Sequence, residues 1–288
     1  MSDVRVGWIG LGAMGWPMAG HLHAQGSLSH VWNRSGDKAQ AFVEQHSGVV
    51  ATADPETLAQ AVDRVMICVS ADQDVLELVE RIKPHLSADK IVVDHSTISP
   101  ASAELAAQQL QEVGVCLIDA PVTGGVEGAI KGILSVMAGG DWDAFQRIQP
   151  TLKAYARVSH HLGGVGRGQA AKAVNQLMVA GIAEAVCESL ALLETLDLPK
   201  EAMLELLGGG AAGSWFLDKR GKTMMADSFE VGFAPNLLLK DLKICDGLTT
   251  QLGFQSAVLP QAIKDYTEVV ATDQTSRDLS ALIRLKRR

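Results

Sequence analysis

The pattern of apolar and polar residues changes about halfway along the chain. From Val4 to about His161, short apolar and β-branched runs alternate with stretches in which apolar residues recur every three or four positions. We expect strands at VRVGWI, SHVW, VMICV, IVVD, VCLID and LSVMA, with helices between them such as DQDVLELVERIKP and SPASAELAAQQLQEV. Strands of this kind are buried on both faces, so helices must cover both sides of the sheet. The first half is therefore predicted to be a doubly wound parallel α/β sheet.

The second half has a different pattern, because strand signals stop after the segment GGVG at residues 163–166. The remainder predicts helices at 169–196, 200–207 and 235–252, with one or two more near the end. We expect two domains, 1–162 and 163–288, of which the second is all-helical. The helix at 169–196 is apolar on nearly every face and must be surrounded by protein. A partner subunit would supply some of that cover, and we expect a homodimer or homotetramer.

Composition narrows the possible partners. The 288 residues carry a formal net charge of −8, and the one dense basic run, IRLKRR, ends the chain, where we expect it to close a helix. Nucleic acid is therefore not an expected partner. The four cysteines are far apart and form no CxxC pair, and the adjacent His160 and His161 would point to opposite faces of a strand, so no metal site is expected. Without a signal peptide or an apolar run of about 18 residues, the chain is expected to be cytoplasmic and not to contact a membrane.

A glycine motif follows the first predicted strand and opens a helix predicted from Met14 to Gln25. It consists of Gly10, Leu11, Gly12, Ala13, Met14 and Gly15. In a G-x-G-x-x-G turn the first glycine allows the tight turn, the second lets the backbone approach a pyrophosphate, and the third lets helix and strand pack closely. The alternative is a glycine-rich turn without a ligand. The position directly after the first strand favours a dinucleotide site.

The end of the second predicted strand bears on the choice of cofactor. Enzymes that use NAD usually place a carboxylate there to bind the ribose hydroxyls, whereas this chain has Asn33, Arg34 and Ser35. An arginine can bind the 2′-phosphate of NADP and stack on the adenine, and Lys38 adds a second positive charge. The sequence therefore predicts NADP. The alternative is that Arg34 is a solvated loop residue.

Hydride transfer to a carbonyl carbon also needs a group that donates a proton to the oxygen. Lys172 is the candidate, because it lies in the first turns of the long second-half helix, with Asn175 three residues further on the same face. Burial and the positive end of the helix dipole would both lower the pKa of this lysine. The alternative is a lysine that points into solvent, which the apolar character of this helix disfavours.

Two further features are open to more than one interpretation. In DAPVTGG, at residues 119–125, successive glycine N–H groups can hold a carboxylate, although the segment taken alone favours a plain strand-to-loop turn. In NLLLKDLKI, Lys240 interrupts an apolar stripe. It either extends past the core to solvent or reaches into a cofactor cleft.

Taken together, five segments resemble the β-hydroxyacid dehydrogenase family and occur in the same order: GLGAMGWPMAGHL, DHSTISP, DAPVTGG, GRGQAAKAVNQ and LLLKDL. The resemblance covers essentially the whole chain. It implies a Rossmann-type N-terminal domain, an all-helical C-terminal domain, and hydride transfer between NADP(H) and a small carboxylate-bearing hydroxy acid or its semialdehyde.

The same resemblance implies roles for single residues. Lys172 would be the catalytic acid/base, and Asn175 and the turn Thr123, Gly124 and Gly125 would bind the substrate. Lys240 would reach the nicotinamide half of the cofactor site, which would also be lined by Val69, Ser70, Asp74 and Thr97. Two departures bear on the substrate: Thr123 stands where serine is commoner, and Gln176 stands where many members have a second asparagine.

Two other functions compete with this interpretation. The imine reductases are similar at the N-terminus, including a V-W-N-R strand end, but they typically carry a different proton donor at the position of Lys172. A non-catalytic NADP-binding sensor would need neither Lys172 nor Asn175.

Overall fold

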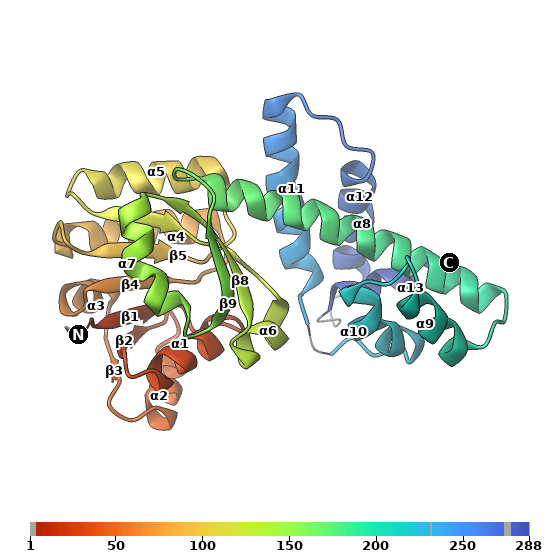
Figure 1. The fold of residues 1–288 in the computed structure, drawn as a ribbon, viewed down its shortest axis with the longest axis horizontal. Coiled ribbons are helices and arrows are strands. Elements are labelled where there is room, and N and C mark those ends of the chain that lie inside the picture. Colours follow the sequence, from red (N-terminus) through yellow and green to blue (C-terminus); the bar gives the residue numbers. More distant parts are fainter. Residues whose placement is uncertain (1–3, 231, 274–277, 288) are drawn as a thin grey trace. The chain divides into compact units, whose positions relative to one another are not determined.

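The computed structural model describes residues 4–230, 232–273 and 278–287. It divides into two compact units, Met1–Lys172 and Ala173–Arg288, which we call the first and second units (Figure 1). Helix α8 (Arg167–Thr195) begins in the first unit and continues into the second.

The strands of the described residues lie in the first unit and form one mixed sheet. Their order is β3-β2-β1-β4-β5-β6-β8-β7, and β9 pairs with β8. Pairing is parallel from β3 to β6 and between β8 and β9, whereas β8 is antiparallel to both β6 and β7. The strands are β1 (Val6–Ile9), β2 (Leu28–Trp32), β3 (Val50–Ala51), β4 (Arg64–Ile67), β5 (Ile91–Asp94), β6 (Cys116–Asp119), β7 (Val122–Thr123), β8 (Leu134–Gly140) and β9 (Ala156–His161).

Helices cover both faces of this sheet because alternate strand residues enter two separate cores. Trp8 and Met66 pack into one core with the helices α1 (Gly15–Ala24), α2 (Gly36–Gln45), α6 (Gly125–Lys131) and α7 (Trp142–Leu152). Their neighbours Ile9 and Ile67 pack on the opposite face with α3 (Pro55–Ala61), α4 (Asp72–Ile82) and α5 (Pro100–Gln111). A short 3₁₀ helix, η1 (Lys83–His85), follows α4. Burial of both faces agrees with the continuous apolar runs in the sequence.

The doubly wound α/β fold expected from the sequence is confirmed, with one difference in the sheet. The six predicted strands are present, and β7 and β8 make the far end of the sheet antiparallel. Strands β3 and β7 were not predicted, and only His160 and His161 of β9 had been placed on a strand. Strands β3 and β7 have two residues each, too few for a periodic signal. Strand β9, with the sequence ARVSHH, is mostly polar. Its partner β8 supplies much of the apolar packing.

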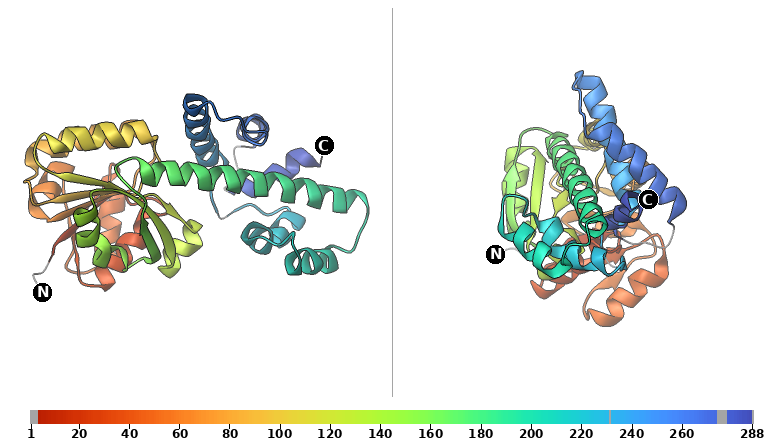
Figure 2. Two further views of the ribbon diagram at one scale, coloured as in Figure 1. Left: turned by 45° about the horizontal axis from the view of Figure 1, so that its top comes forward. Right: turned by 90° about the vertical axis from the view of Figure 1, so that its right-hand side faces the viewer.

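Helices, joined by loops, are the only regular secondary structure in the described residues of the second unit. Besides α8 it contains α9 (Lys200–Gly209), α10 (Trp215–Met225), α11 (Pro235–Leu252), α12 (Leu259–Thr272), η2 (Leu279–Ala281) and α13 (Leu282–Lys286). Helices α11 and α12 are consecutive and pack side by side (Figure 2). One face of α8, with Ala180, Ala183, Cys187 and Leu190, is buried in the core of this unit. Helix α10 was not predicted.

Helix α8 is long and apolar enough, by length and composition alone, to cross a membrane, although no such segment was expected. Half of its most apolar 18-residue window is buried inside the protein. The core helix of a globular unit meets the same criterion.

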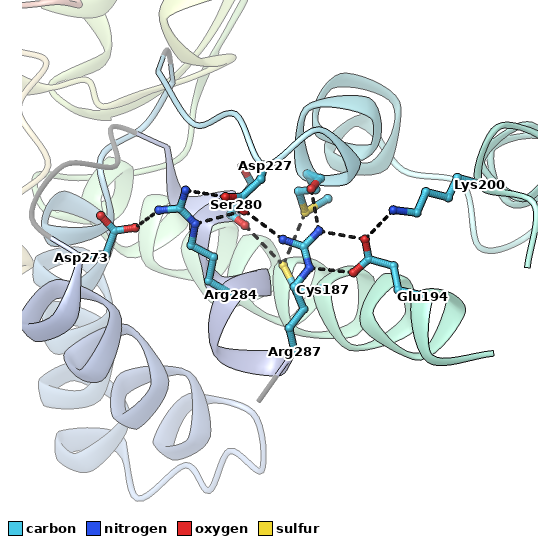
Figure 3. A network of polar contacts seen from close by, with 9 residues as sticks. Cys187, Glu194, Lys200, Asp227, Asp273, Ser280, Arg284 and Arg287 are labelled. Atoms are coloured by element: carbon cyan, nitrogen blue, oxygen red, sulfur yellow. Dashed lines mark hydrogen bonds and ion pairs between the residues drawn. The ribbon is translucent and has the colours of Figure 1, made fainter. Parts of the chain in front are cut away.

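The basic run at the end of the chain is engaged in ion pairs (Figure 3). Arg287 donates to both oxygens of Glu194 on α8, at 2.7 and 3.0 Å. Arg284 contacts Asp227 at 2.8 Å and Asp273 at 2.7 Å. These contacts tie α13 to α8 and to the segments after α10 and α12. Arg288 lies outside the described residues.

Candidate active site

The glycine turn between β1 and α1 leaves no room for a side chain at Gly10 or Gly15. Gly10 has a φ of +98°, and a Cβ there would lie 2.2 Å from the main-chain oxygen of Cys68. A Cβ on Gly15 would lie 1.9 Å from the main-chain oxygen of Gly10. At Gly12, by contrast, a Cβ would meet no described atom within 4 Å. The turn is therefore closely packed on its inner side and open at Gly12.

This open side suits the diphosphate of a dinucleotide. Among the described residues, no side chain caps the N-terminus of α1, which begins at Gly15. The first N–H groups of a helix have no partner within the helix and carry partial positive charge. An open backbone at Gly12 beside an uncapped helix N-terminus fits a phosphate-bearing cofactor. We expect the residues of this turn to bind that cofactor in the first unit.

The inner side of the turn rests on a buried aromatic group that sequence reasoning missed. The indole N–H of Trp8 donates to the main-chain oxygen of Gly10 at 2.9 Å. Trp8 stacks on His95 at 5.7 Å between ring centroids, and the edge of Tyr155 packs against both rings. His95 Nδ1 donates to the main-chain oxygen of Ala120 at 2.6 Å, because a carbonyl can only accept, and Tyr155 lies 2.8 Å from Nε2. Burial lowers the pKa of His95 to about 4, so the ring is neutral.

Asn33, the first residue after β2, contacts the glycine turn directly. The N–H of Leu11 donates to Asn33 Oδ1 at 2.8 Å, and Asn33 Nδ2 donates to the main-chain oxygen of Ser35 at 3.0 Å. The Arg34 side chain is 83% exposed and forms an ion pair of 3.0 Å with Asp74, in the first turn of α4. Ser35 and Lys38 are exposed beside it.

The other residues expected at the cofactor follow neighbouring parallel strands. Val69 and Ser70 come after β4, and Thr97 comes after β5. Strands β1, β4 and β5 are in register at their carboxyl ends, where Ile9 pairs with Ile67 and Ile67 with Asp94. The two loops are joined by a 2.9 Å hydrogen bond from the N–H of Val69 to Ser96 Oγ. The structure thus gathers these residues at the carboxyl edge of the sheet, where open α/β sheets bind ligands.

Lys172 lies against the turn expected to hold a carboxylate. Its ammonium donates to the main-chain oxygen of Val122 at 2.9 Å, and the residue is buried, with 7% exposure. Val122 begins the segment that continues through Thr123 and Gly124 into α6 at Gly125. A lysine from α8 and a turn nearly 50 residues earlier are therefore adjacent.

Two buried side chains fix the start of α8, and neither had been expected to matter. Asp119 at the end of β6 accepts hydrogen bonds from the N–H groups of Gly166 and Gln169, each at 2.9 Å. Burial raises the pKa of this carboxyl to about 6, although the N–H donors oppose the shift. Gln169 donates to the main-chain oxygen of Ser96 at 2.8 Å and accepts from the N–H of Ile98 at 3.2 Å. The loop that carries Thr97 is thereby tied to the helix that carries Lys172.

In the second unit, a chain of polar contacts includes the remaining expected residues. Asp241 accepts from Gln176 Nε2 at 2.7 Å and lies 3.1 Å from the ammonium of Lys240. Because a carboxylate can only accept hydrogen bonds, Gln176 must point its Nε2 toward Asp241 and its Oε1 away from it. The Oε1 atom of Gln176 accepts a hydrogen bond from Asn175 Nδ2 at 2.8 Å. The carboxylate of Asp241 thus sets the orientation of both amides.

No group of histidine, cysteine, aspartate or glutamate side chains in the described part of the chain is arranged to hold a metal ion.

Comparison with known proteins agrees with this geometry. Residues 5–166 match the family model of the NAD-binding domain of 6-phosphogluconate dehydrogenase, and residues 166–286 match that of the NAD-binding domain of NADP-dependent 3-hydroxyisobutyrate dehydrogenase. The chain is 34% identical to 2-hydroxy-3-oxopropionate reductase of Escherichia coli over 244 residues, 84% of this chain and 82% of that protein. It is 33% identical to 2-(hydroxymethyl)glutarate dehydrogenase of Eubacterium barkeri over 261 residues, 89% and 85% of the two chains.

A solved structure is similar over nearly the full length. It is described as Psf3 in complex with NADP+ and 2-OPP. It is 25% identical, covers 97% of this chain and 99% of its own, and superposes with a TM-score of 0.90.

The fold and these matches define an NAD(P)-dependent oxidoreductase that acts on hydroxy acids and binds a nicotinamide cofactor. The chain belongs to the β-hydroxyacid dehydrogenase family. Neither the imine reductase nor the sensor function is favoured by the comparisons.

Proposed function

We propose that the protein interconverts a small 3-hydroxy acid and its semialdehyde with NADP(H), and that it works in the cell as a reductase. The observation that carries this proposal is the buried Lys172, whose ammonium lies 2.9 Å from the main-chain oxygen of Val122, directly before Thr123. NADPH pools in cells are kept reduced, which favours the reductive direction.

Each residue has a defined task in this reaction. The cofactor, when bound, supplies the hydride. Lys172 Nζ donates a proton to the carbonyl oxygen during reduction and removes it from the hydroxyl in the reverse direction. The backbone N–H groups of Thr123, Gly124 and Gly125 bind the substrate carboxylate, and Asn175 helps to orient the substrate. The two named relatives support a carboxylate-bearing substrate, because 2-hydroxy-3-oxopropionate and 2-(hydroxymethyl)glutarate are both hydroxy carboxylates.

The preference for NADP rests on the end of β2. Asn33 occupies the position where a ribose-binding carboxylate would favour NAD, and it is held by the N–H of Leu11. Arg34 and Lys38 are exposed beside it and would bind the 2′-phosphate. The solved relative that holds NADP+ supports the same choice. The nicotinamide half of the cofactor is assigned to Val69, Ser70, Thr97 and Lys240. Asp74, which was expected in the same group, pairs with Arg34 at 3.0 Å and is assigned instead to the adenosine half.

Replacement of Lys172 by methionine tests the proton-donor role. We expect Lys172→Met to lower kcat/KM by roughly 10²- to 10⁴-fold, the usual effect of losing a general acid. The Kd for NADPH, measured by fluorescence titration, should change by less than about twofold, because binding does not need the proton donor. The exposed Lys153 offers a matched control, and Lys153→Met should leave both quantities unchanged.

The assay should use a panel of semialdehydes, glyoxylate and 3-hydroxy acids, each with NADPH and NADH. Turnover of Lys172→Met at the parental rate would exclude the lysine mechanism. If the parent bound NADPH but turned over none of the panel, the sensor alternative would gain support.

A further inference from the structure

The contact between Arg34 and Asp74 joins the two loops that flank the glycine turn. Arg34 follows β2 and Asp74 lies in the first turn of α4, after β4, and β2 and β4 are the two neighbours of β1 in the sheet. The Arg34 Nη1 atom lies 3.0 Å from Asp74 Oδ1. The arginine side chain is 83% exposed and the aspartate side chain 25% exposed, so Asp74 is the more buried partner.

We propose that Asp74 is a specificity-determining residue that limits the preference of this protein for NADP over NAD. Asp74 binds the same guanidinium that would bind the 2′-phosphate of NADP. This inference rests on the proposed role of Arg34 at that phosphate.

Competition follows from the chemistry of the two anions. A guanidinium binds a carboxylate and a phosphate by the same planar donors, so the contact with Asp74 must be given up or shared when a 2′-phosphate binds. The phosphate then also lies near a second negative charge, which opposes its binding. A ribose with a free 2′-hydroxyl meets no such repulsion, since a hydroxyl can donate to a carboxylate.

The other charges nearby do not replace Asp74 in this role. Asp72, two residues earlier, accepts a 2.9 Å hydrogen bond from the N–H of Ser99. Lys38 adds positive charge and would favour the phosphate. Glu80 is exposed near the other end of α4. Asp74 is thus the carboxylate that the structure places on Arg34.

Binding of two adenosine nucleotides measures the effect without turnover. The probes are adenosine 2′,5′-bisphosphate and 5′-AMP, titrated calorimetrically into the full-length protein at low and moderate salt. We expect Asp74→Asn to lower the Kd of the bisphosphate about fivefold, corresponding to the upper range of an exposed ion pair. The Kd of 5′-AMP should stay within about twofold, and added salt should shrink the difference between the variants. Glu80→Gln removes the same charge from the same helix and should change neither Kd.

Replacement of Arg34 separates this inference from the function on which it rests. Arg34→Ala should abolish most of the preference for the bisphosphate over 5′-AMP, and in that background Asp74→Asn should have little further effect. If Arg34→Ala abolishes the preference but Asp74→Asn leaves it unchanged, the role of Asp74 is wrong and the assignment of Arg34 stands. If Arg34→Ala leaves the preference intact, both are wrong.

Discussion

Gln169, in the first turn of α8, donates a 2.8 Å hydrogen bond from Nε2 to the main-chain oxygen of Ser96 in the loop after β5. The same amide accepts from the N–H of Ile98, and the side chain is almost fully buried, with 1% exposure. Lys172 lies three residues further along α8, and Thr97 lies between the two loop residues that Gln169 contacts. One side chain therefore links the expected proton donor to the expected cofactor loop.

Replacement of Gln169 by methionine, which has a similar volume, should destabilise the protein. The change leaves the buried N–H of Ile98 and the buried oxygen of Ser96 without this partner. At about 1 to 3 kcal/mol for each of these two groups, we expect the free energy of unfolding to fall by roughly 2 to 6 kcal/mol. We also expect kcat to fall about tenfold or more, because Lys172 loses part of its support. Urea unfolding and steady-state kinetics measure both effects.

The exposed Gln111, at the end of α5, provides the control for that substitution. Gln111→Met should change stability by less than about 0.5 kcal/mol. Equal effects of the two substitutions would show that the hydrogen bonds of Gln169 contribute nothing specific.

Two buried titratable groups should give the stability opposite pH dependences. The raised pKa of Asp119, about 6 against an ordinary 3.8, means that the folded state binds this proton more tightly than the unfolded chain. The contribution of Asp119 to the free energy of unfolding is complete below about pH 4 and is lost as the pH rises through about 6. The pKa of His95 is lowered by burial to about 4 from 6.5. Its contribution is complete above about pH 6.5 and is lost as the pH falls through about 4.

Urea unfolding of the parent, Asp119→Asn and His95→Gln between pH 4 and 8 tests both signs. From pH 4 to 7, the stability of the parent relative to Asp119→Asn should fall by about 2 to 3 kcal/mol. Relative to His95→Gln it should rise by a similar amount over the same range. If the stability difference between parent and variant changed with pH in the same direction for both variants, that would contradict the burial of one of the two groups.

The features that sequence patterns predicted are those encoded by residues close together in the chain. Helix α11 runs from Pro235 to Leu252 as expected, because a proline in its first turn and Gly253 at its end mark both limits locally. The glycine turn was likewise predicted from consecutive residues. Helix α10 was missed, because Gly221 and several charges interrupt its periodicity, and it depends on burial of Phe216, Leu217 and Met224 in the second unit.

The hydrogen bonds and ion pairs that hold the residues of the candidate site in place could not be predicted in the same way. Asp119 was visible as a strand-end aspartate, but its N–H donors at Gly166 and Gln169 lie 47 and 50 residues later. The contact between Arg34 and Asp74 spans 40 residues. Local periodicity carries no information on such pairs, because the order of strands in the sheet brings them together.

Replacement of Trp8 by phenylalanine tests whether the buried aromatic group supports the cofactor turn. The indole N–H of Trp8 is the donor to the main-chain oxygen of Gly10, and Trp8 is fully buried. Phenylalanine keeps a ring in the core but removes that donor and loses some packing. We expect the Kd for NADPH to rise about three- to tenfold and stability to fall by roughly 1 to 2 kcal/mol. Trp142→Phe is the matched control, since Trp142 is 53% exposed on α7, and it should alter neither quantity. If Trp8→Phe lowered stability but left the Kd unchanged, the hydrogen bond to Gly10 would serve the core of the first unit and not the cofactor turn.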